Sequence, residues 1–338
     1  MNTKMEAVII ENDEAVGLRT VTIQNKNGMS LQLTNYGATI MSLKVPNKHN
    51  GLTDVNVGLA SVEDYLGILY QENKLYLGSS IGRYAGRISN GGFVVNTEDY
   101  TIYQDNGVHL HGGKSGLDDK LWEIDAVTDT TVTMRYLSPH LEEGYPGNLA
   151  VKAVFELTDS NALKIKYTAK TDCATPVNLT SHPYFNLNGK GTILDHDLII
   201  NSNAYLDVDS QLLPSGIITK SEKTNFDRRE PTKLGREDFE GFDDTFVLDT
   251  DPIKASLSSD ETGIELTVYS NQKGMVVFTP KIFPELPFSE DFNGVGFPAI
   301  CFEPQNFPDA PNQPDFPNSI LQPGEKYVNE IVYAFSRL

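Results

Sequence analysis

Apolar and polar residues alternate with a period of two along much of the chain. In Leu149–Leu157 every second residue is apolar, and Thr131–Leu137, Leu163–Tyr167 and Ile264–Val268 show the same kind of alternation. A period of two indicates a strand with one buried face, and the valines, threonines and aromatic residues of these stretches suit a pleated surface. Clusters of Gly, Asn and Asp separate the stretches, so we expect many half-buried strands joined by turns.

Helical patterns are rare by comparison. Ser61-Val62-Glu63-Asp64 resembles a capping box, with Asp64 in place of the usual Glu, and it predicts one short helix. The chain has no long stretch with a 3.6-residue period and no alternation of strands with helices, which argues against a parallel α/β fold. Because no shift in composition, internal repeat or low-complexity linker marks a boundary, we expect one all-β, antiparallel domain spanning residues 1–338.

The composition narrows the class of function. With 338 residues, of which 39% are hydrophobic, the chain can build a sizeable core. Its formal net charge of −19 is spread along the chain and repels nucleic acid and anionic membranes. The same charge disfavours phosphorylated substrates, although a local basic pocket could override it. We therefore expect a neutral polar substrate, with neither nucleic acid nor a membrane as a partner.

The sequence also predicts a reduced protein in the cytoplasm. No apolar run approaches the roughly 18 residues that a membrane helix needs, and the first residues do not resemble a signal peptide. Cys173 and Cys301 lie far apart and suggest neither a disulfide framework nor a CxxC metal motif. Because Cys301 stands in an apolar run, we expect it to pack as a small hydrophobic residue.

A proline-rich segment follows the apolar stretch Pro298–Phe302. Residues 303–318 contain five prolines, which predict a stiff loop rather than a helix or a central strand. Glu303 stands where the strand ends and the loop begins, so we place its carboxylate at the rim of the core. Partial desolvation there would raise the pKa of Glu303 and make it a stronger base. The alternative is an exposed glutamate at a strand end.

Two histidine motifs raise the question of metal or proton chemistry. If Gly107–Gly113 is a strand, His109 and His111 point to the same face and could bind a metal. Alternatively, one or both rings hydrogen-bond a turn, since residues 112–116 lack the carboxylate that would complete such a metal site. His182, which stands shortly before two aromatic residues, could be a buried structural ring, a metal ligand or a proton carrier.

Two further segments carry charged residues among glycines and aromatics. Gly82–Phe93 contains two arginines but lacks the pattern of a phosphate-binding loop. An arginine there could stabilise a turn, or its guanidinium could donate to a sugar hydroxyl or a nearby carboxylate. Gly241–Phe246 places Asp243 and Asp244 between aromatic residues. These acids could end a strand, or a carboxylate could accept hydrogen bonds from two sugar hydroxyls.

Taken in order along the chain, these segments resemble the aldose 1-epimerase (galactose mutarotase) family. The resemblance begins at Asn35-Tyr36-Gly37-Ala38 and continues through the segments above to Glu303–Asn312, so it covers nearly the whole chain. No single motif is decisive, but six motifs in the same order are strongly specific. The resemblance implies a large antiparallel β-sandwich, often called a supersandwich. It also implies interconversion of the α and β anomers of free aldohexoses such as galactose and glucose.

The resemblance assigns roles to particular residues. Glu303 matches the general base of the family and His182 its general acid. Five further positions match substrate-binding residues: Arg87, His111, Tyr184, Asp243 and Gln272. No metal or organic cofactor is implied, and we expect a monomer or a homodimer. The chain departs from common family residues at Gly86, at Pro183 and at Asp244-Thr245, which bears on sugar preference more than on the type of reaction.

Four other functions are compatible with parts of the pattern. A glycoside hydrolase would use Glu303 and Asp243 as its two carboxylates. A metal-dependent enzyme would use His109, His111 and a further ligand. A sugar-binding protein without turnover would not need an acid–base pair. A hexose-6-phosphate epimerase would need a basic cluster, for which residues 228–229 are a candidate.

Overall fold

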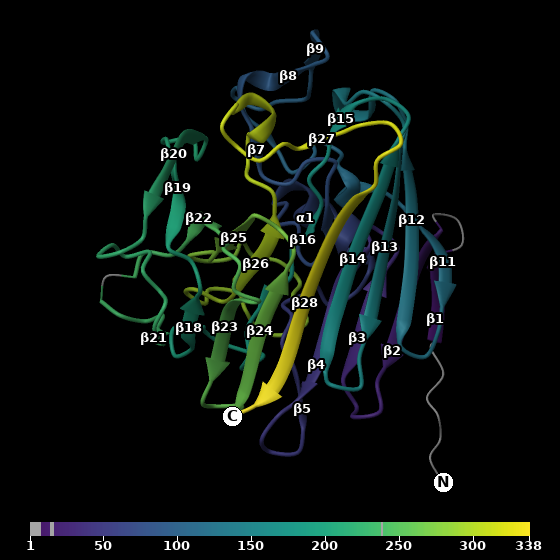
Figure 1. Cartoon of the computed structure of the whole chain (residues 1–338). Coiled ribbons are helices and arrows are strands. Elements are labelled where there is room, and N and C mark those ends of the chain that lie inside the picture. Colours follow the sequence, from purple (N-terminus) through teal and green to yellow (C-terminus); the bar gives the residue numbers. More distant parts are fainter. Residues whose placement is uncertain (1–7, 14–16, 238) are drawn as a thin grey trace.

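The computed structural model describes residues 8–13, 17–237 and 239–338, and for residues 8–13 it describes the backbone alone. Its largest element is a nine-stranded sheet, seen face on in Figure 1. In spatial order the strands of this sheet are β11 (Glu123–Val127), β12 (Thr131–Ser138), β13 (Leu149–Leu157), β14 (Ala162–Thr171), β28 (Tyr327–Arg337), β24 (Ile264–Ser270), β23 (Ile253–Ser259), β18 (Asp197–Ile200) and β21 (Thr232–Lys233).

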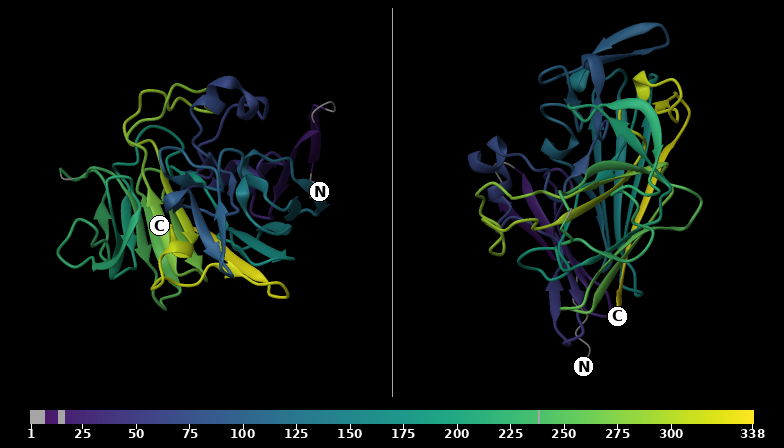
Figure 2. Two further views of the ribbon diagram at one scale, coloured as in Figure 1. Left: turned by 90° about the horizontal axis from the view of Figure 1, so that it is seen from above. Right: turned by 90° about the vertical axis from the view of Figure 1, so that its left-hand side faces the viewer.

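Two smaller sheets pack against this one. The five-stranded sheet runs in chain order and consists of β1 (Val8–Asp13), β2 (Leu18–Gln24), β3 (Ser30–Thr34), β4 (Thr39–Pro46) and β5 (Leu52–Asp54). The six-stranded sheet has the order β17 (Tyr184–Phe185), β26 (Ile300–Gln305), β25 (Gly274–Phe278), β22 (Asp243–Val247), β19 (Ala204–Val208) and β20 (Pro214–Lys220). In the side view of Figure 2, strands β2–β4 (purple) and strand β28 (yellow) lie in different layers.

Short elements connect the sheets. Four strand pairs stand alone: β10 (His109–Leu110) with β7 (Arg87–Ile88), β15 (Thr175–Pro176) with β27 (Ile320–Leu321), β16 (Thr180–Ser181) with β6 (Ser80–Ile81), and β8 (Gly92–Val95) with β9 (Glu98–Thr101). The described helices are α1 (Ile68–Glu72) and the 3₁₀ turns Glu63–Leu66, Ser89–Gly91, Leu117–Asp119, Glu142–Gly144 and Ala310–Asn312. None of the helices in the described part of the chain is both long and apolar enough to cross a bilayer.

The main core lies between the nine-stranded sheet and the two smaller sheets. Leu31 of β3, Phe155 of β13 and Phe302 of β26 belong to one buried apolar cluster. Along β13 the apolar residue of each alternate position is buried, as the period-two pattern predicts. Fully burying a side chain of this kind stabilises the fold by about 1.5–3 kcal/mol relative to leaving it exposed. The predicted all-β, antiparallel architecture is therefore confirmed.

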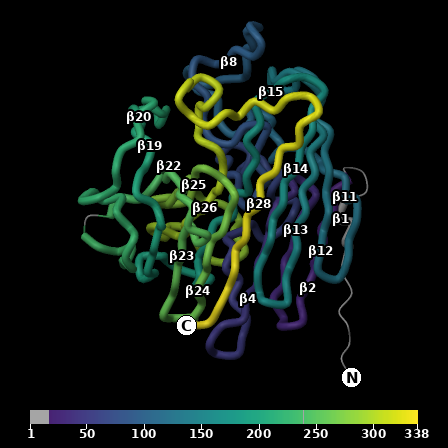
Figure 3. The backbone as a smooth tube through the Cα atoms, in the orientation of Figure 1, coloured from purple at the N-terminus to yellow at the C-terminus, as the bar shows by residue number. Residues whose placement is uncertain are grey.

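The C-terminal strand β28 lies in the middle of the large sheet, as the tube in Figure 3 shows. It pairs with β14 on one side and with β24 on the other, both antiparallel. The last strand thus joins the two halves of the sheet, one built from β11–β14 and the other from later strands. Both halves bury their inner faces against the smaller sheets. The six-stranded sheet therefore packs on one continuous large sheet.

The capping residues predicted near position 61 act as expected. The Ser61 N–H donates to Asp64 Oδ2 at 2.9 Å, and the Asp64 N–H donates to Ser61 Oγ at 3.3 Å. This reciprocal pair satisfies backbone donors at the start of the turn Glu63–Leu66, which leads directly into α1. The helix expected there exists, and it consists of one 3₁₀ turn and one short α-helix.

The strand that carries Glu303 is longer than predicted. It runs through Pro304 to Gln305, so Glu303 lies inside β26 and not at its end. Pro304 fits because its carbonyl accepts from the Thr180 hydroxyl and the Asn329 amide, so this edge of the residue faces away from β25. In an antiparallel strand the N–H and C=O of one residue point to the same side, and the missing N–H therefore leaves the ladder with β25 intact.

Candidate active site

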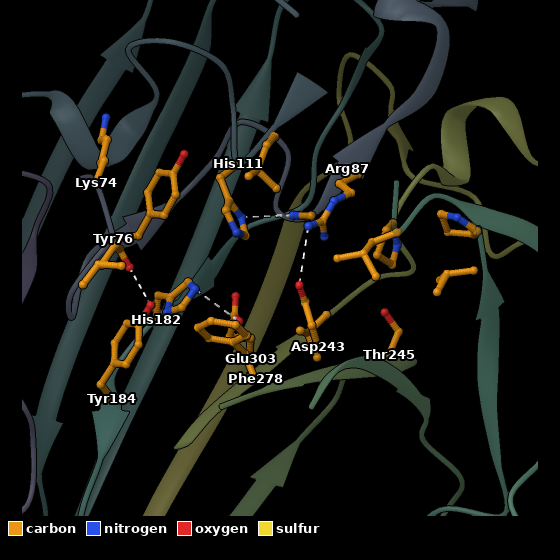
Figure 4. A pocket seen from close by; sticks show the side chains of 18 residues that line it. Lys74, Tyr76, Arg87, His111, His182, Tyr184, Asp243, Thr245, Phe278 and Glu303 are labelled. Carbon is orange, nitrogen blue, oxygen red and sulfur yellow. Dashed lines mark hydrogen bonds and ion pairs between the residues drawn. The ribbon is translucent and has the colours of Figure 1, made fainter. Parts of the chain in front are cut away.

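A cavity of about 190 Å³ lies over the six-stranded sheet and collects most of the predicted site residues. Strands β22, β25 and β26 supply its floor, and the loops around residues 74–76, 86–87 and 110–111 supply one wall. The hairpin of β19 and β20 supplies an opposite, apolar rim through Val208, Leu212 and Pro214. Six predicted residues line this cavity: Arg87, His111, His182, Tyr184, Asp243 and Glu303. Figure 4 shows their side chains turned toward one another.

Glu303 and His182 form the innermost pair. The Nε2 atom of His182 lies 3.3 Å from Oε1 of Glu303, and the side chains are 5% and 1% exposed. Glu303 comes from the middle of β26, where it stands opposite Val276 of β25. His182 follows β16 and precedes β17, so two short strand pairings fix its backbone on both sides. Glu303 is therefore held by a paired strand, and His182 by paired strands immediately before and after it.

Burial acts on both partners of this pair in opposite directions. It raises the pKa of the Glu303 carboxyl well above its ordinary value of 4.5, with the nearby Asp243 adding to the rise. It lowers the pKa of His182 from 6.5 to about 4. A nearby carboxylate ordinarily raises the pKa of a histidine, but at His182 the loss of water around the ring is the larger effect. Neither residue is stable as an isolated charge, so the pair suits the exchange of a single proton.

His111 presents a neutral N–H to the cavity. Its Nδ1 atom accepts a hydrogen bond from the Gly86 N–H at 3.2 Å, so Nδ1 carries no proton. Burial and the neighbouring His182 hold the pKa of His111 well below its usual value. The remaining proton of the neutral ring is therefore on Nε2, where it can be donated to an oxygen atom of a ligand.

Arg87 and Asp243 lie side by side in the cavity. Arg87 Nη2 lies 3.5 Å from Asp243 Oδ2, at the limit of a hydrogen bond, and both side chains line the cavity, so their remaining donors and acceptors are available to ligand hydroxyl groups. Burial raises the pKa of Asp243, and the positive charge of Arg87 opposes that rise. A guanidinium beside a carboxylate offers several donors and acceptors in fixed directions, which is the arrangement that vicinal hydroxyl groups require.

The departures from common family residues have distinct positions. Gly86 adopts a positive φ of +79°, and a Cβ atom there would lie 3.0 Å from Pro308 and 3.2 Å from Gln305. An asparagine could take its place only if these neighbours moved. Thr245 lines the cavity next to Asp243, whereas Asp244 does not. The Asp244 carboxylate instead accepts from the Asp243 N–H at 3.0 Å.

The expectation that His109 and His111 share a face is wrong. Strand β10 ends at Leu110, and His111 has a positive φ of 52°, which turns its ring away from the strand direction. His109 is buried elsewhere, with Nδ1 2.6 Å from the Tyr103 carbonyl and Nε2 2.6 Å from the Tyr145 hydroxyl. A metal site that includes both histidines is therefore incompatible with this structure.

A different trio could hold a metal. The candidate ligand atoms of His111, His182 and Glu303 lie within 4.8 Å of one another. Two neutral imidazoles and one carboxylate are suitable donors for a first-row divalent ion. The same three groups also suit proton transfer, so the distinction requires a measurement, which is included among the experiments below.

Gln272 is the predicted site residue that the structure does not bring to this cavity. Its amide donates to the Val328 carbonyl at 3.3 Å and to Asn271 Oδ1 at 3.0 Å. It lines a separate surface hollow together with Asn318 and Lys326. Gln272 lies in the turn before β25, whereas the residues of that strand that line the cavity are Val276 and Phe278.

Several lining residues were not identified from the sequence. Lys74, Tyr76 and Phe278 are among them. Tyr76 contacts both histidines, with ring centroids 4.7 Å from His111 and 6.2 Å from His182. Phe278 stands on β25, where an apolar residue in a strand is indistinguishable in sequence from any other core residue. No pattern in the sequence marks Tyr76, because its position depends on an unusual backbone conformation that is described below.

Comparison with known proteins identifies the family. The family model described as aldose 1-epimerase matches residues 19–334. The chain belongs to the aldose 1-epimerase family. Its curated relatives in this family include the galactose mutarotase of Mus musculus, which is 37% identical over 321 residues, or 91% of each chain. The aldose 1-epimerase of Escherichia coli (strain K12) is 31% identical over 333 residues, which cover 94% of this chain and 95% of that protein.

Solved structures of aldose 1-epimerase relatives share the fold. A GalM/aldose epimerase homologue from C. elegans superposes with a TM-score of 0.87 at 27% identity, covering 98% of this chain and 99% of that one. Galactose 1-epimerase from Lactobacillus acidophilus NCFM superposes with a TM-score of 0.83 at 27% identity, covering 98% of both chains. The large antiparallel β-sandwich that the family resemblance implied is therefore confirmed.

Proposed function

We propose that this chain is an aldose 1-epimerase, an isomerase that interconverts the α and β anomers of free aldohexoses such as galactose and glucose. The observation that carries the proposal is the Glu303–His182 pair, 3.3 Å apart inside a cavity whose walls carry further polar groups. The family and its curated relatives support the same reaction. A neutral hexose suits the net charge of −19 better than a phosphorylated sugar does.

The reaction starts with the shared proton on His182 and with Glu303 ionised. Hydroxyl groups of the bound sugar donate hydrogen bonds to Glu303, which offsets the effect of burial on its anion. Glu303 takes the proton from the C1 hydroxyl while His182 gives its proton to the ring oxygen. The bond between C1 and the ring oxygen breaks, its electron pair stays on that oxygen, and C1 becomes an aldehyde carbonyl.

Ring closure repeats these steps in reverse. Rotation about the C1–C2 bond presents the other face of the aldehyde to the C5 hydroxyl. His182 takes the proton of that hydroxyl as the ring closes, and Glu303 returns its proton to the oxygen on C1. Both residues recover their starting states, so no other reactant is consumed. No metal or organic cofactor enters this scheme.

The other polar residues position the sugar in this scheme. The N–H on Nε2 of His111 donates to an oxygen near His182. Arg87 and Asp243 bind hydroxyl groups on the opposite part of the ring, where their 3.5 Å separation lets them act together. Tyr184 supports the ring of His182, with centroids 5.0 Å apart and planes 19° apart. Fixed donors and acceptors of this kind lower the barrier because they hold the reacting atoms in line.

The proposal is tested by the rate of anomer exchange. Mutarotation of α-galactose and α-glucose is followed by polarimetry or by NMR, with xylose, maltose and lactose as further sugars. Glu303→Gln is nearly isosteric and removes the base, and His182→Asn removes the acid. Each is expected to lower kcat by about 10²–10⁴-fold, the usual contribution of one proton-transfer group. Wild-type activity in either variant would refute these roles.

Two controls separate this reaction from the alternatives. A metal on His111, His182 and Glu303 predicts loss of activity in a chelator and recovery with added zinc, whereas the proton scheme predicts no change. A chromogenic galactoside or glucoside that releases its leaving group would indicate a hydrolase using Glu303 and Asp243. The expected compartment, the cytoplasm, and the expected monomer or homodimer stay predictions from the sequence.

A further inference from the structure

Tyr76 has a backbone conformation that aromatic residues rarely adopt. Its φ is 56°, in the left-handed region. For a bulky residue this conformation costs of order 1–3 kcal/mol, and it persists only where the surroundings enforce it. Glycine would adopt the same φ without this cost. The presence of a tyrosine here therefore calls for a reason in what its side chain contacts.

The loop of Tyr76 is tied to the segment that carries His182. The Gly78 N–H donates to the His182 carbonyl at 3.0 Å, and the His182 N–H donates to the Ser79 carbonyl at 3.0 Å. The Tyr184 hydroxyl donates to the Leu75 carbonyl at 2.8 Å. These three hydrogen bonds fix residues 75–79 against residues 182–184, so Tyr76 cannot shift independently of His182.

The Tyr76 ring lies against both histidines of the cavity. It is nearly parallel to His182, with an angle of 25° between planes, and it meets His111 edge on at 65°. Figure 4 shows the His182 ring between the rings of Tyr76 and Tyr184. Behind Tyr76, the Lys74 ammonium lies 5.5 Å from the ring centroid and is held by Asp118 at 2.6 Å.

His182 lacks the contact that usually orients a catalytic histidine. Such a ring is normally held by a hydrogen bond on the nitrogen that does not react. The Nδ1 atom of His182 is buried and, among the described residues, has no hydrogen-bond partner outside its own residue. Aromatic contacts are then the interactions that fix the plane of the ring and the direction of Nε2.

We propose that Tyr76 is a positioning residue for His182: its ring, together with Tyr184, fixes the plane of the imidazole so that Nε2 faces Glu303 and the reacting oxygen. The edge contact with His111 holds the second imidazole in the same arrangement. This role rests on the proposed function, in which His182 is the acid. It explains why a tyrosine occupies a left-handed position that would suit glycine better.

The first experiment compares three substitutions at position 76. Tyr76→Phe keeps the ring and is expected to keep kcat within about threefold. Tyr76→Leu and Tyr76→Gly remove it and are expected to lower kcat by about 10–100-fold with KM nearly unchanged, because a slightly misplaced acid affects the chemical step more than binding. Tyr76→Gly also relieves the backbone, so its unfolding temperature should not fall below that of Tyr76→Leu. Wild-type kcat in Tyr76→Leu, or equal losses in Tyr76→Phe and Tyr76→Leu, would overturn the role.

The second experiment asks whether Tyr76 acts through His182. In a double-mutant cycle with His182→Asn, the loss caused by Tyr76→Leu should largely disappear, because the residue that it orients is gone. An undiminished loss in the His182→Asn background would contradict the proposal. Full activity in His182→Asn alone would instead refute the proposed function, so the two failures are distinguishable.

A spectroscopic measurement gives a readout that does not depend on turnover. The carbon-bound ring protons of His182 lie near two tyrosine rings, whose ring currents displace their NMR signals. Tyr76→Phe is expected to retain this displacement, and Tyr76→Leu is expected to reduce it and to broaden the signals. Unchanged His182 signals in a folded Tyr76→Leu protein would show that the ring is oriented by something else.

Discussion

The Gly86 N–H donates to His111 Nδ1 at 3.2 Å, and this single contact decides which nitrogen of His111 carries the proton. Gly86 has a positive φ of +79°, so its N–H points at the ring because the chain turns sharply just before Arg87. The glycine therefore affects the chemistry of the cavity although it contributes no side chain.

Replacing His111 should weaken binding and catalysis together. His111→Phe keeps the ring shape but removes the N–H that faces the ligand, and we expect kcat/KM to fall by about 10–100-fold, the effect of a lost hydrogen bond to a polar ligand atom in a buried site. His111→Gln, which offers an amide N–H, is the matched control and should lose less. Mutarotation rates over a range of galactose concentrations measure both kcat and KM. A Phe variant with unaltered kcat/KM would contradict the donor role.

The rate of anomer exchange should fall on the alkaline side, where the Glu303–His182 pair loses its one proton. The scheme needs that proton, and burial together with Asp243 raises the pKa of Glu303, which holds the proton when no sugar is bound, well above 4.5. Activity is therefore present below this raised pKa and disappears as the pH rises through it, because His182, with a pKa of about 4, then has no proton to give. The measurement is kcat/KM for galactose between about pH 4 and pH 9.

The Asp243→Asn variant is the control for this pH profile. Asp243 contributes to the raised pKa of Glu303, so its neutral replacement should move the alkaline limb of the profile to lower pH. The absolute rate should also fall, because a proposed sugar-binding group is lost. An alkaline limb that stays in place, or moves to higher pH, would show that another group controls it.

Lys74 should matter to stability in a pH-dependent way. Its ammonium lies 2.6 Å from the Asp118 carboxylate, which is 1% exposed. Lys74→Met leaves that carboxylate buried without its partner, which typically costs about 3–5 kcal/mol, less here because Lys74 is partly exposed. Burial already raises the pKa of Asp118 to about 6, and loss of Lys74 raises it further.

The sign of this effect follows from the protonation of Asp118. At pH 8 the buried carboxylate is charged and the Lys74→Met variant is destabilised relative to the wild type. At pH 5 the carboxylate is protonated, so the difference between the two proteins should shrink. Urea unfolding at both pH values measures it, and Lys74→Met combined with Asp118→Asn should be more stable at pH 8 than Lys74→Met alone. A difference that grows with acidity would contradict this account.

Gly78 should be far less tolerant of substitution than a glycine in open space. A Cβ atom at Gly78 would lie 2.0 Å from the Ile40 carbonyl oxygen, and the residue has a φ of +68°. Gly28 also has a positive φ, of +86°, but its Cβ would meet no atom within 4 Å. Gly28→Ala should cost about 1 kcal/mol through its backbone alone, whereas Gly78→Ala should cost more, because Ile40 must also move.

The same pair of variants separates stability from activity. Gly78 donates to the His182 carbonyl, so any movement of its backbone displaces the proposed acid. Gly78→Ala should therefore lower kcat even at temperatures where it is fully folded, and Gly28→Ala should not. Thermal unfolding and mutarotation, measured on the same preparations, test this. Equal behaviour of the two variants would mean that the contact with Ile40 is relieved without consequence.

The sequence predicted those elements whose local pattern also decides their environment. In Leu149–Leu157 the alternation is strict because one face is buried along the whole strand, so both its limits and its buried side were predicted. At Glu303 the local pattern misled, because a proline normally ends a strand, whereas Pro304 keeps its place by facing away from β25. That difference depends on a neighbouring strand that is distant in sequence.

In the candidate site, too, some features could be predicted from the sequence and others depend on the folded backbone. The family resemblance led to Glu303, His182 and Arg87, which do lie together. It could not reveal that His111 turns away from His109, since a positive φ has no signature in a His-x-His motif. Likewise nothing in the order of residues shows that a tyrosine at position 76 would be held against two imidazoles.

The hairpin of β19 and β20 contributes only apolar side chains to the cavity, and in the six-stranded sheet it is separated by β25 and β22 from the strand that holds Glu303. In the proposed function, the apolar rim that limits the outline of a sugar and the groups that move protons thus belong to separate stretches of polypeptide. Exchange of residues 208–214 for those of a relative would then change which sugars fit, while the acid and the base keep their positions. Such a division lets proteins with this fold differ in sugar preference while they keep the same acid and the same base.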